Sequence, residues 1–511
     1  MEGCNPHGNY GVCETCRRQV PCRHEKRAGK VYIVKDCPDC GPTEALISSD
    51  AARWQAKRDL WQYDPAGARV CRMNCDVCGY DHHPKMLFLN VTNRCNMNCP
   101  ICIANIPGMG FEFHPPMAYF ERVLDGLSRM TPKPTVQLFG GEPTVREDLF
   151  DIIELAQRKG LRVRIVTNGL RLADEAYCKR ICEAKVPVLL SLDGMNREIY
   201  QRLRRNPGAF DKKMKAFANL AKHCTRKHTI MCCVAQGIND EQLGDLIAFC
   251  HENRRFIKDL HLIPLTETWE EGEFETDVAT NIEDVERIVN DAFPDDTVEF
   301  LPAGLASHLK RAITFFGSPR LTFGGAHPNC ESAALLVSDG ERFRPVNHFL
   351  RMPLNDLGAE VVRRAKPLEK RLAHLDPDRS LQRWRGRFLV LRALGGLGLR
   401  VLDRKKIFRG NSLLAMLRAA GGVLIGRRLK DQLRRYTRFS DTLLMIILPF
   451  EEYHSIEGER LQNCPSGFAF LDPDTEQVKT IPVCGYSLYR DELERKIADK
   501  YREKTPAAPQ A

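Results

Sequence analysis

Short apolar runs alternate with amphipathic stretches between residues 85 and 295. In the amphipathic stretches, apolar side chains recur at intervals of three and four residues, the spacing of one helix face. Strands that alternate with helices in this way predict a parallel sheet with right-handed crossovers. We expect strands at 86–91, 136–139, 163–167, 186–191, 229–234 and 260–265. We expect helices at 148–159, 174–184, 210–223 and 241–253.

Six strand–helix units predict an α/β fold, an open, partial (β/α)6 barrel. Ligands of such folds lie at the C-terminal ends of the strands. Residues 1–83 hold nine cysteines and few periodic apolar runs, which is typical of a small module that metals stabilise. We therefore expect a cysteine-rich metal-binding module at 1–83, the barrel at 84–300 and an α+β C-terminal region at 301–511.

The cysteine content indicates a metalloprotein rather than a barrel without metals. The chain has 21 cysteines, an odd number that excludes complete pairing into disulfides. Its first residues contain no apolar run typical of a signal peptide, and its longest apolar stretch, 443–448, is far too short to span a membrane. We therefore expect a cytoplasmic protein in which clustered thiols bind metals.

A cysteine triplet follows the first expected strand, in the sequence NVTNRCNMNCPIC. Three thiolates in one tight loop can ligate three irons of a cubane cluster, which leaves the fourth iron open to a cofactor or substrate. The alternative is three buried or zinc-binding cysteines. The triplet consists of Cys95, Cys99 and Cys102.

Polar and glycine-rich motifs follow the next three strands. Glycines let the backbone approach a ligand closely, and a glutamate offers an acceptor for an ammonium group. Each motif alone also fits an ordinary turn. The candidate ligand-binding residues are Gly140, Gly141, Glu142 and Pro143 after the second strand, Thr167 and Asn168 after the third, and Ser191 and Asp193 after the fourth.

The cysteine spacing, followed one strand later by GGEP, resembles the radical S-adenosylmethionine (SAM) superfamily. The resemblance implies a [4Fe-4S] cluster on the triplet and SAM bound at the strand ends, with its amino group held by GGEP. It also implies a reduced electron donor such as ferredoxin or flavodoxin. Ile101 would then contact the adenine. Arg204 could meet the SAM carboxylate, but we expect it to lie on the surface.

Further cysteines predict further metal sites. A second triplet, Cys71, Cys75 and Cys78, favours an auxiliary iron–sulfur cluster over structural zinc. Two CxxC knuckles, Cys13/Cys16 and Cys37/Cys40, suit tetrahedral zinc or a rubredoxin-like iron. Cys330, Cys464 and Cys484 are expected to converge on another cluster. Core packing is the expected role of Cys178, Cys182, Cys224, Cys232, Cys233 and Cys250.

Motifs along nearly the whole chain resemble one radical SAM subgroup, which includes the archaeal tetraether lipid synthase and sequences labelled pterin methyltransferases. The motifs read CETC, CPDCG, CRMNCDVC, VTNRCN, HPNC and PVCGY. Cys40 stands where the subgroup has histidine, which favours a four-thiolate site. The subgroup's fourth auxiliary-cluster cysteine has no counterpart at 84–86.

One segment makes the protein basic. The whole chain carries a formal charge of +10, whereas residues 383–438 alone carry sixteen Lys or Arg against two acids. Basic amphipathic helices favour anionic membrane surfaces. Nucleic acid is disfavoured because few aromatic residues are interleaved, and a solvated helix face is the third alternative.

These motifs favour a radical SAM enzyme that acts on lipid chains, by C–C coupling or another change at an unactivated alkyl carbon. The alternative is a methyltransferase or maturase acting on a pterin, a peptide or RNA. A non-catalytic iron–sulfur electron carrier is the third class, and GGEP with its companion motifs argues against it because a carrier needs no open iron. The sequence assigns no catalytic acid, base or radical-quenching residue.

Overall fold

The structure is a computed structural model that describes residues 8–62, 84–267, 273–317 and 323–502. The expected metal ligands Cys71, Cys75 and Cys78 lie outside these residues. Among the described helices, none is both long and apolar enough to cross a membrane.

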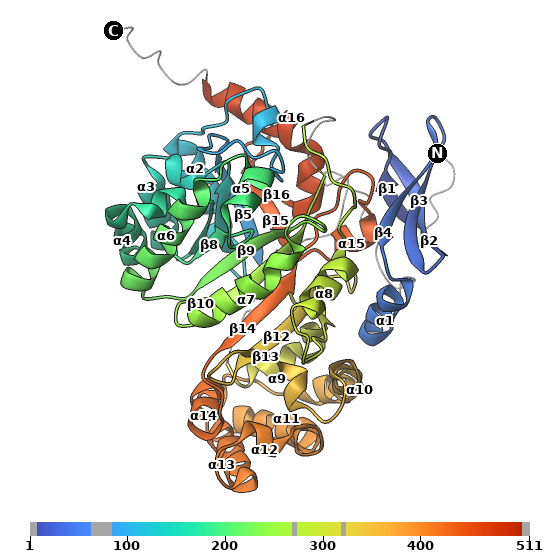
Figure 1. Ribbon diagram of the computed structural model, residues 1–511, viewed down its shortest axis with the longest axis vertical. Coiled ribbons are helices and arrows are strands. Elements are labelled where there is room, and N and C mark those ends of the chain that lie inside the picture. The colour runs from blue at the N-terminus through green and yellow to red at the C-terminus, as the bar shows by residue number, and fades with distance from the viewer. Residues whose placement is uncertain (1–7, 63–83, 268–272, 318–322, 503–511) are drawn as a thin grey trace.

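A small antiparallel sheet forms the N-terminal module and stands at one side of the molecule (Figure 1). Buried salt bridges join the helix that follows it to a barrel helix and to the C-terminal region: Lys57 pairs with Glu283 at 2.7 Å, and Arg58 pairs with Glu459 at 3.1 Å. The strands are β1 (Asn9–Val12), β2 (Gln19–Arg27), β3 (Lys30–Cys37) and β4 (Gly41–Ser48), and the helix is α1 (Ala51–Trp61).

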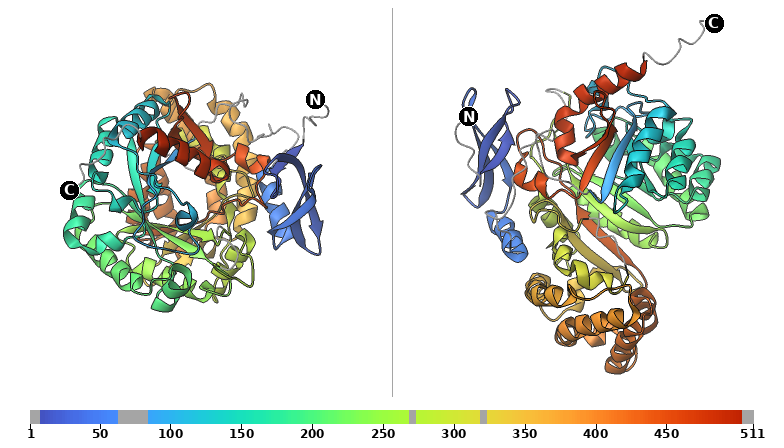
Figure 2. Two further views of the ribbon diagram at one scale, coloured as in Figure 1. Left: turned by 90° about the horizontal axis from the view of Figure 1, so that it is seen from above. Right: turned by 180° about the vertical axis from the view of Figure 1, so that it is seen from behind.

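Six parallel strands, neighbours in chain order from β5 to β10, form the centre of a second sheet. Helices cover the outside of this curved sheet, as the view from above in Figure 2 shows. The expected partial (β/α)6 barrel is thereby confirmed. Its strands are β5 (Met86–Thr92), β6 (Thr135–Gly140), β7 (Arg162–Thr167), β8 (Val188–Ser191), β9 (His228–Val234) and β10 (Ile257–Pro264). Its helices are α2 (Met117–Arg129), α3 (Leu149–Arg158), α4 (Glu175–Glu183), α5 (Arg197–Arg204), α6 (Ala209–His223), α7 (Leu243–Glu252) and α8 (Ile282–Asp291).

Strands from the C-terminal region extend this sheet at both edges. One strand, β14 (Thr442–Ile447), pairs parallel to β10, and another, β15 (Ser466–Leu471), pairs parallel to β5. The C-terminal segment therefore lies beside both ends of the barrel. The remaining elements here are β11 (Leu301–Pro302), α9 (Lys310–Thr314), β12 (Ser332–Ser338), β13 (Phe343–Pro345), α15 (Gly458–Gln462), β16 (Val478–Pro482) and α16 (Val483–Arg502).

A group of helices between β13 and β14, here named the helical lobe (residues 354–436), projects from the bottom of the molecule in Figure 1. It joins β14 at that strand's N-terminal end, so it lies at the end of the sheet where the parallel strands begin. The lobe contains most of the basic segment. Its helices are α10 (Leu354–Leu372), α11 (Ser380–Val401), α12 (Arg404–Ile407), α13 (Ser412–Leu424) and α14 (Leu429–Tyr436).

The main core lies between the barrel strands and their helices. Phe120 and Leu124 of α2 and Leu138 of β6 are fully buried in this core, as amphipathic spacing predicts for the helix. Full burial of such a side chain contributes roughly 1.5–3 kcal/mol. This packing holds the strand ends, and the loops that follow them, in fixed positions.

Candidate active site

The loops after the barrel strands surround one pocket, here named the strand-end pocket, at the C-terminal ends of β5 to β10. The expected cysteine triplet and most of the expected ligand-binding residues line it together. The residues with polar or thiol groups are Cys95, Cys99, Cys102, Glu142, Thr167, Asn168, Ser191, Arg204, Cys233 and Thr266.

Two glycines bring the end of β6 against the start of the cysteine loop. A Cβ on Gly140, whose φ is 132°, would lie 2.2 Å from the carbonyl oxygen of Thr92, and one on Gly141 would lie 2.4 Å from that of Arg94. Backbone hydrogen bonds fill this space instead, from Gly141 N to Thr92 O and from Glu142 N to Arg94 O. Only glycine fits here, because any side chain would push the two loops apart.

The buried carboxylate of Glu142 joins two strand ends. Its Oε1 accepts hydrogen bonds from the backbone N–H and hydroxyl of Thr144 and from the hydroxyl of Thr167, at 3.0, 2.6 and 2.7 Å. Its Oε2 accepts the backbone N–H of Asn168 at 2.7 Å. Pro143 follows as the first residue of a short 3₁₀ turn, Pro143–Val145. The carboxylate thus lies in the pocket wall in a fixed orientation.

A buried lysine that sequence reasoning missed supports the floor of the pocket. Lys213 of α6 donates to the carbonyl oxygen of Asn168 at 2.6 Å and to both the carbonyl oxygen and the hydroxyl of Ser191 at 2.7 Å. Burial lowers the pKa of Lys213 to about 8. The only signal in the sequence was its place on the apolar face of an amphipathic helix, beside Ala216 and Phe217.

Asp193 and Arg204 form a buried, bidentate ion pair. Both carboxylate oxygens accept from the Arg204 guanidinium at 2.8 Å, and one also accepts the backbone N–H of Cys233 at 3.0 Å. Arg204 lines the pocket, so the expectation of a surface position for it is wrong. Asp193 lies behind Arg204 with its side chain fully buried. Cys233 also faces the pocket, although core packing was expected for it.

In the N-terminal module, four sulfur atoms come together. Cys13 and Cys16 from the turn after β1 meet Cys37 at the end of β3 and Cys40 in the turn that follows, and all four Sγ atoms lie within 4.8 Å of one another. This arrangement fits one tetrahedral metal ion. Cys22 of the same sheet is buried outside this group.

Two families match the sequence. Residues 89–250, from β5 to α7, match the Radical SAM superfamily, and residues 6–49 match the HMPTM N-terminal zinc ribbon domain. The chain contains a radical SAM domain. A radical SAM domain uses a [4Fe-4S] cluster and SAM, so the protein is a radical SAM enzyme, and its zinc-ribbon-like module indicates a further metal site.

One relative resembles this radical SAM protein over nearly its full length. The 7,8-dihydro-6-hydroxymethylpterin dimethyltransferase of Methanocaldococcus jannaschii is 25% identical over 95% of this chain and 94% of its own. The Fe-coproporphyrin III synthase of Methanosarcina barkeri is 34% identical over 25% of this chain and 32% of its own. A solved structure described as native anSMEcpe with bound AdoMet and Cp18Cys peptide is 22% identical over 41% of this chain and 59% of that chain, with a TM-score of 0.34.

The residues of the strand-end pocket fit a [4Fe-4S] cluster and SAM chemically. The pocket presents three thiols of one loop for a cubane cluster, and a glutamate and an arginine for the charged ends of an amino acid. Ile101, buried among Leu203 and Leu265, adds an apolar wall.

The three late cysteines lie near one another in the C-terminal region, where Cys330 and Cys484 are buried and Cys464 is half-buried. The guanidinium of Arg460 approaches the Cys330 sulfur at 3.9 Å, and the backbone N–H of Glu451 donates to the Cys484 sulfur at 3.4 Å. Cys464 donates its S–H to the carbonyl oxygen of Ser466 at 3.1 Å. Among the described residues, these sulfurs are not gathered closely enough for a single ion, so a shared cluster stays a prediction.

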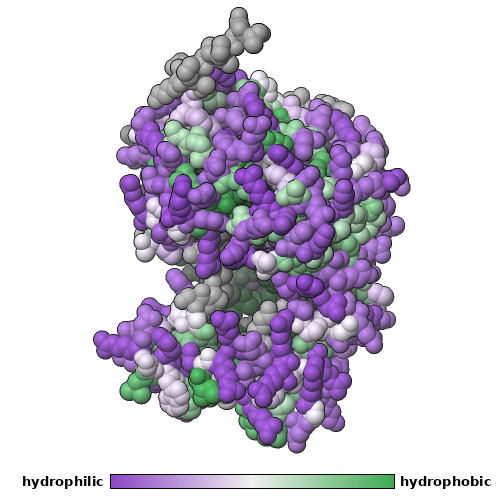
Figure 3. Space-filling model, turned by 90° about the vertical axis from the view of Figure 1, so that its left-hand side faces the viewer, coloured by the Kyte–Doolittle hydropathy of each residue, from purple (hydrophilic) through white to green (hydrophobic). Residues whose placement is uncertain are grey.

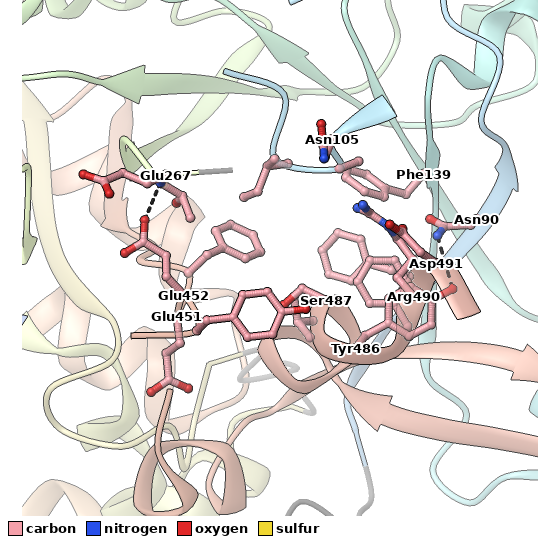
Figure 4. A pocket seen from close by; sticks show the side chains of 18 residues that line it. Asn90, Asn105, Phe139, Glu267, Glu451, Glu452, Tyr486, Ser487, Arg490 and Asp491 are labelled. Atoms are coloured by element: carbon pink, nitrogen blue, oxygen red, sulfur yellow. Dashed lines mark hydrogen bonds and ion pairs between the residues drawn. The ribbon is translucent and has the colours of Figure 1, made fainter. Parts of the chain in front are cut away.

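A second cavity, here named the outer cavity, adjoins the strand-end pocket and shares Ile103, Ala104, Phe139 and Thr266 with it. It lies between the mouth of the barrel and the start of α16 (Figure 4). Aromatic rings of five elements or loops form its walls. These aromatic residues are Phe88, Phe139, Phe450, Tyr453, Phe468 and Tyr486.

Most of the charged groups around the outer cavity have an ion-pair partner, inside or outside the cavity. Glu452 accepts a hydrogen bond from the backbone N–H of Glu267 and pairs with His454, while Arg490 pairs with Asp491 at 3.2 Å. In Figure 4 the Glu451 carboxylate points away from the rings. Behind the wall, buried Glu494 accepts the Tyr486 hydroxyl at 2.8 Å and fixes that ring. The surface that faces a ligand is therefore mainly aromatic.

Replacing Cys37 by serine is expected to remove the metal of the N-terminal module and to unfold that module locally. The binding free energy of such a metal, about 10–16 kcal/mol for zinc-finger peptides, is also folding free energy. Elemental analysis for zinc and iron measures the loss. Cys22→Ala is the matched control, since Cys22 is buried in the same sheet but outside the sulfur group. Equal metal content in both variants would contradict the assignment.

Proposed function

We propose that this radical SAM enzyme removes a hydrogen atom from an unactivated carbon of an apolar substrate held in the outer cavity. When bound, the reduced cluster and SAM supply a 5′-deoxyadenosyl radical that takes the hydrogen atom. The protein's part is to hold SAM at the strand ends, to place the substrate carbon next to it and to exclude water.

Most of the residues expected from the sequence have a role in holding the cluster or SAM. Cys95, Cys99 and Cys102 hold the cluster. Glu142, with the backbone of Gly140 and Gly141, holds the amino end of SAM, and Arg204 meets its carboxylate. Asp193 positions Arg204 and does not itself contact SAM. Thr167, Asn168 and Ser191 hold the surrounding wall through the contacts to Glu142 and Lys213.

The auxiliary metal sites are also part of the proposal. The module of Cys13, Cys16, Cys37 and Cys40 holds zinc or a single iron. Cys330, Cys464 and Cys484 hold an iron–sulfur cluster. The upstream triplet Cys71, Cys75 and Cys78 holds another, and a reduced ferredoxin or flavodoxin supplies electrons.

The aromatic character of the outer cavity supports an alkyl substrate. Phe139 belongs to both the outer cavity and the strand-end pocket, so a chain lying along the rings reaches the SAM site. A lipid hydrocarbon chain offers only C–H bonds, which suit the aromatic walls of the cavity. Joining two chain carbons requires one hydrogen atom to leave each carbon, with one SAM and one electron consumed for each hydrogen. Such a substrate brings the enzyme to the membrane as a peripheral protein.

A pterin is the second candidate, favoured by the nearly full-length similarity to a pterin dimethyltransferase. A planar heterocycle stacks on aromatic rings, and Phe468 and Tyr486 already lie stacked with centroids 4.1 Å apart in the wall. Carboxylates at the rim, such as Glu267 and Glu452, would accept hydrogen bonds from ring N–H groups.

Deuterium transfer is expected to identify the substrate class. The reduced enzyme is incubated with SAM and either chain-deuterated phospholipid or deuterated hydroxymethylpterin, and 5′-deoxyadenosine is analysed by mass spectrometry. The proposal expects deuterium from the lipid chain in the product, because hydrogen abstraction moves that atom to the 5′ carbon. Label from the pterin alone would select the second candidate, and SAM cleavage without label from either would reject both.

A Phe139→Ala variant tests whether the substrate reaches SAM through the outer cavity. The shortened side chain opens the wall that the two cavities share, so label transfer is expected to fall much more than SAM cleavage itself. Phe150→Ala, in α3 and outside both cavities, is the matched control.

A further inference from the structure

The helical lobe exposes large apolar side chains that the described fold does not cover. Of the ten large hydrophobic residues that are strongly exposed in the described chain, seven lie in or directly after α11 and α13. Leu381 is 81% exposed and Ile425 is 69% exposed. The seven residues are Leu381, Trp384, Phe388, Leu413, Leu414, Leu417 and Ile425.

These side chains follow the helix period. On α11, Leu381, Trp384 and Phe388 recur at intervals of three and four residues, and the Trp384 and Phe388 rings lie parallel with centroids 5.8 Å apart. Arg385 and Arg392 are exposed and share this face by the same spacing. The outer face of α11 therefore alternates apolar and cationic groups along one line.

Helix α13 is apolar on two faces. Its inner face carries the buried residues Ala415, Ala419 and Gly422, and a Cβ on Gly422 would lie only 2.1 Å from the Gln432 side chain of α14. Its outer face carries Leu413, Leu414 and Leu417 in solvent. A helix that is apolar on more than one side is normally buried on each of them. The outer face is thus unpartnered in the described chain.

The charge of the surrounding residues indicates which kind of partner covers the outer faces of α11 and α13. Between Asp403 and Asp431 the sequence contains no acid, and α11 contains none either. Arg418, Arg427 and Arg428 are exposed beside the leucines. In Figure 3 hydrophobic patches lie among hydrophilic atoms on the lower part of the molecule, where the lobe is. A second copy of the same lobe would bring like charges together, and nucleic acid would leave the apolar side chains uncovered.

We propose that the outer faces of α11 and α13 dock on an anionic lipid bilayer. The leucines, Trp384 and Phe388 enter the headgroup boundary, and the arginines contact anionic headgroups. This surface lies at the N-terminal ends of the barrel strands, away from the outer cavity. The inference therefore stands apart from the proposed substrate and holds for a pterin as well as for a lipid.

The test is co-sedimentation of the full-length protein with vesicles of phosphatidylcholine alone or mixed with phosphatidylglycerol. Wild type is expected to bind the mixed vesicles at least about tenfold more tightly, with the difference lost in high salt. Two variants, L413S/L417S and R418Q/R427Q/R428Q, are each expected to weaken this binding at least about tenfold, since insertion and charge attraction add. All changed residues are exposed, so SAM cleavage in solution stays at the wild-type rate.

The matched control is R158Q/K179Q/R197Q, which removes exposed cations from α3, α4 and α5 and is expected to leave vesicle binding unchanged. Equal binding to neutral and mixed vesicles, or no effect of either lobe variant, overturns the inference. A dimer that L413S/L417S dissociates would identify a second copy as the occupant and overturn it too, as would RNA retention without vesicle binding. Deuterium transfer to 5′-deoxyadenosine with detergent-solubilised substrate tests the proposed reaction separately, since it does not depend on docking.

Discussion

Replacing Cys99 by alanine is expected to abolish reductive SAM cleavage. Cys99 lines the strand-end pocket with Cys95 and Cys102, and loss of one thiolate leaves the proposed cubane cluster with two protein ligands. Changes in the outer shell of metal sites already cost 10–100-fold, so loss of a ligand is expected to cost at least about 100-fold. The measurement is 5′-deoxyadenosine formed with dithionite after anaerobic reconstitution.

Cys224→Ala is the control for this variant, because Cys224 is a half-buried thiol at the C-terminal end of α6 and lies outside the pocket. It is expected to keep wild-type activity and iron. Iron that remains in Cys99→Ala belongs to the auxiliary sites, so the same samples measure their occupancy. Cleavage at the wild-type rate by Cys99→Ala would show that the cluster is bound elsewhere.

Replacing Asp193 by alanine is expected to destabilise the fold by about 3–5 kcal/mol and to weaken SAM binding. The substitution leaves the Arg204 guanidinium without its buried partner, and an uncompensated buried charge carries a cost of this size. Arg204 also loses the two hydrogen bonds that fix its orientation in the pocket. Urea unfolding measures the first effect, and calorimetric titration with SAM measures the second.

The contribution of the Asp193–Arg204 pair to the free energy of unfolding depends on pH in a direction that follows from the pKa of Asp193. Although burial opposes ionisation, Arg204 and other partners lower the pKa of Asp193 below its ordinary value. The pair's stabilisation is therefore complete above the unfolded pKa of about 3.9 and is lost as pH falls through the lower folded value. The stability gap between wild type and Asp193→Ala is expected to be constant near neutral pH and to shrink only in strong acid.

Asp211→Ala provides the comparison, because Asp211 pairs with Arg197 of the neighbouring helix at 3.0 Å and both side chains are more than half exposed. Such surface pairs contribute about 0–1 kcal/mol. Similar losses from Asp193→Ala and Asp211→Ala would mean that the buried pair is not a structural support of the pocket.

The barrel was predictable because its signals are local. Apolar runs and helix-period stretches placed all six strands within about three residues. One expected boundary, at 186, moves to Val188 because Pro187 has no N–H to offer a neighbouring strand. By contrast, the pairing of β15 with β5 joins residues 466–468 to 86–88. No local sequence pattern predicts a contact between segments that are so far apart in the chain.

The site was predictable in part for the same reason. Cysteines bind metals and glycines allow close backbone approach, so the spacing of these residues in the sequence was enough to find the triplet and GGEP. The roles of Lys213 and Arg204 depend on which strand ends their helices cover, which is decided by tertiary packing. Asp193 was expected to face a ligand because Asp-Gly follows a strand, but its neighbour Arg204 takes both oxygens.

One strand, β14, runs from the helical lobe to the outer cavity: α14 precedes it, and Phe450 of the cavity wall follows it. Six residues of strand span about 20 Å. A bilayer under the lobe would therefore leave the cavity mouth in the aqueous phase, separated from the lobe by the length of this strand. A lipid chain would have to desorb before reacting, at a cost of about 0.8 kcal/mol for each CH₂ exposed. Turnover of a lipid on vesicles should then slow as its chain lengthens. A water-soluble pterin does not have to leave the bilayer, so vesicles should not slow its turnover.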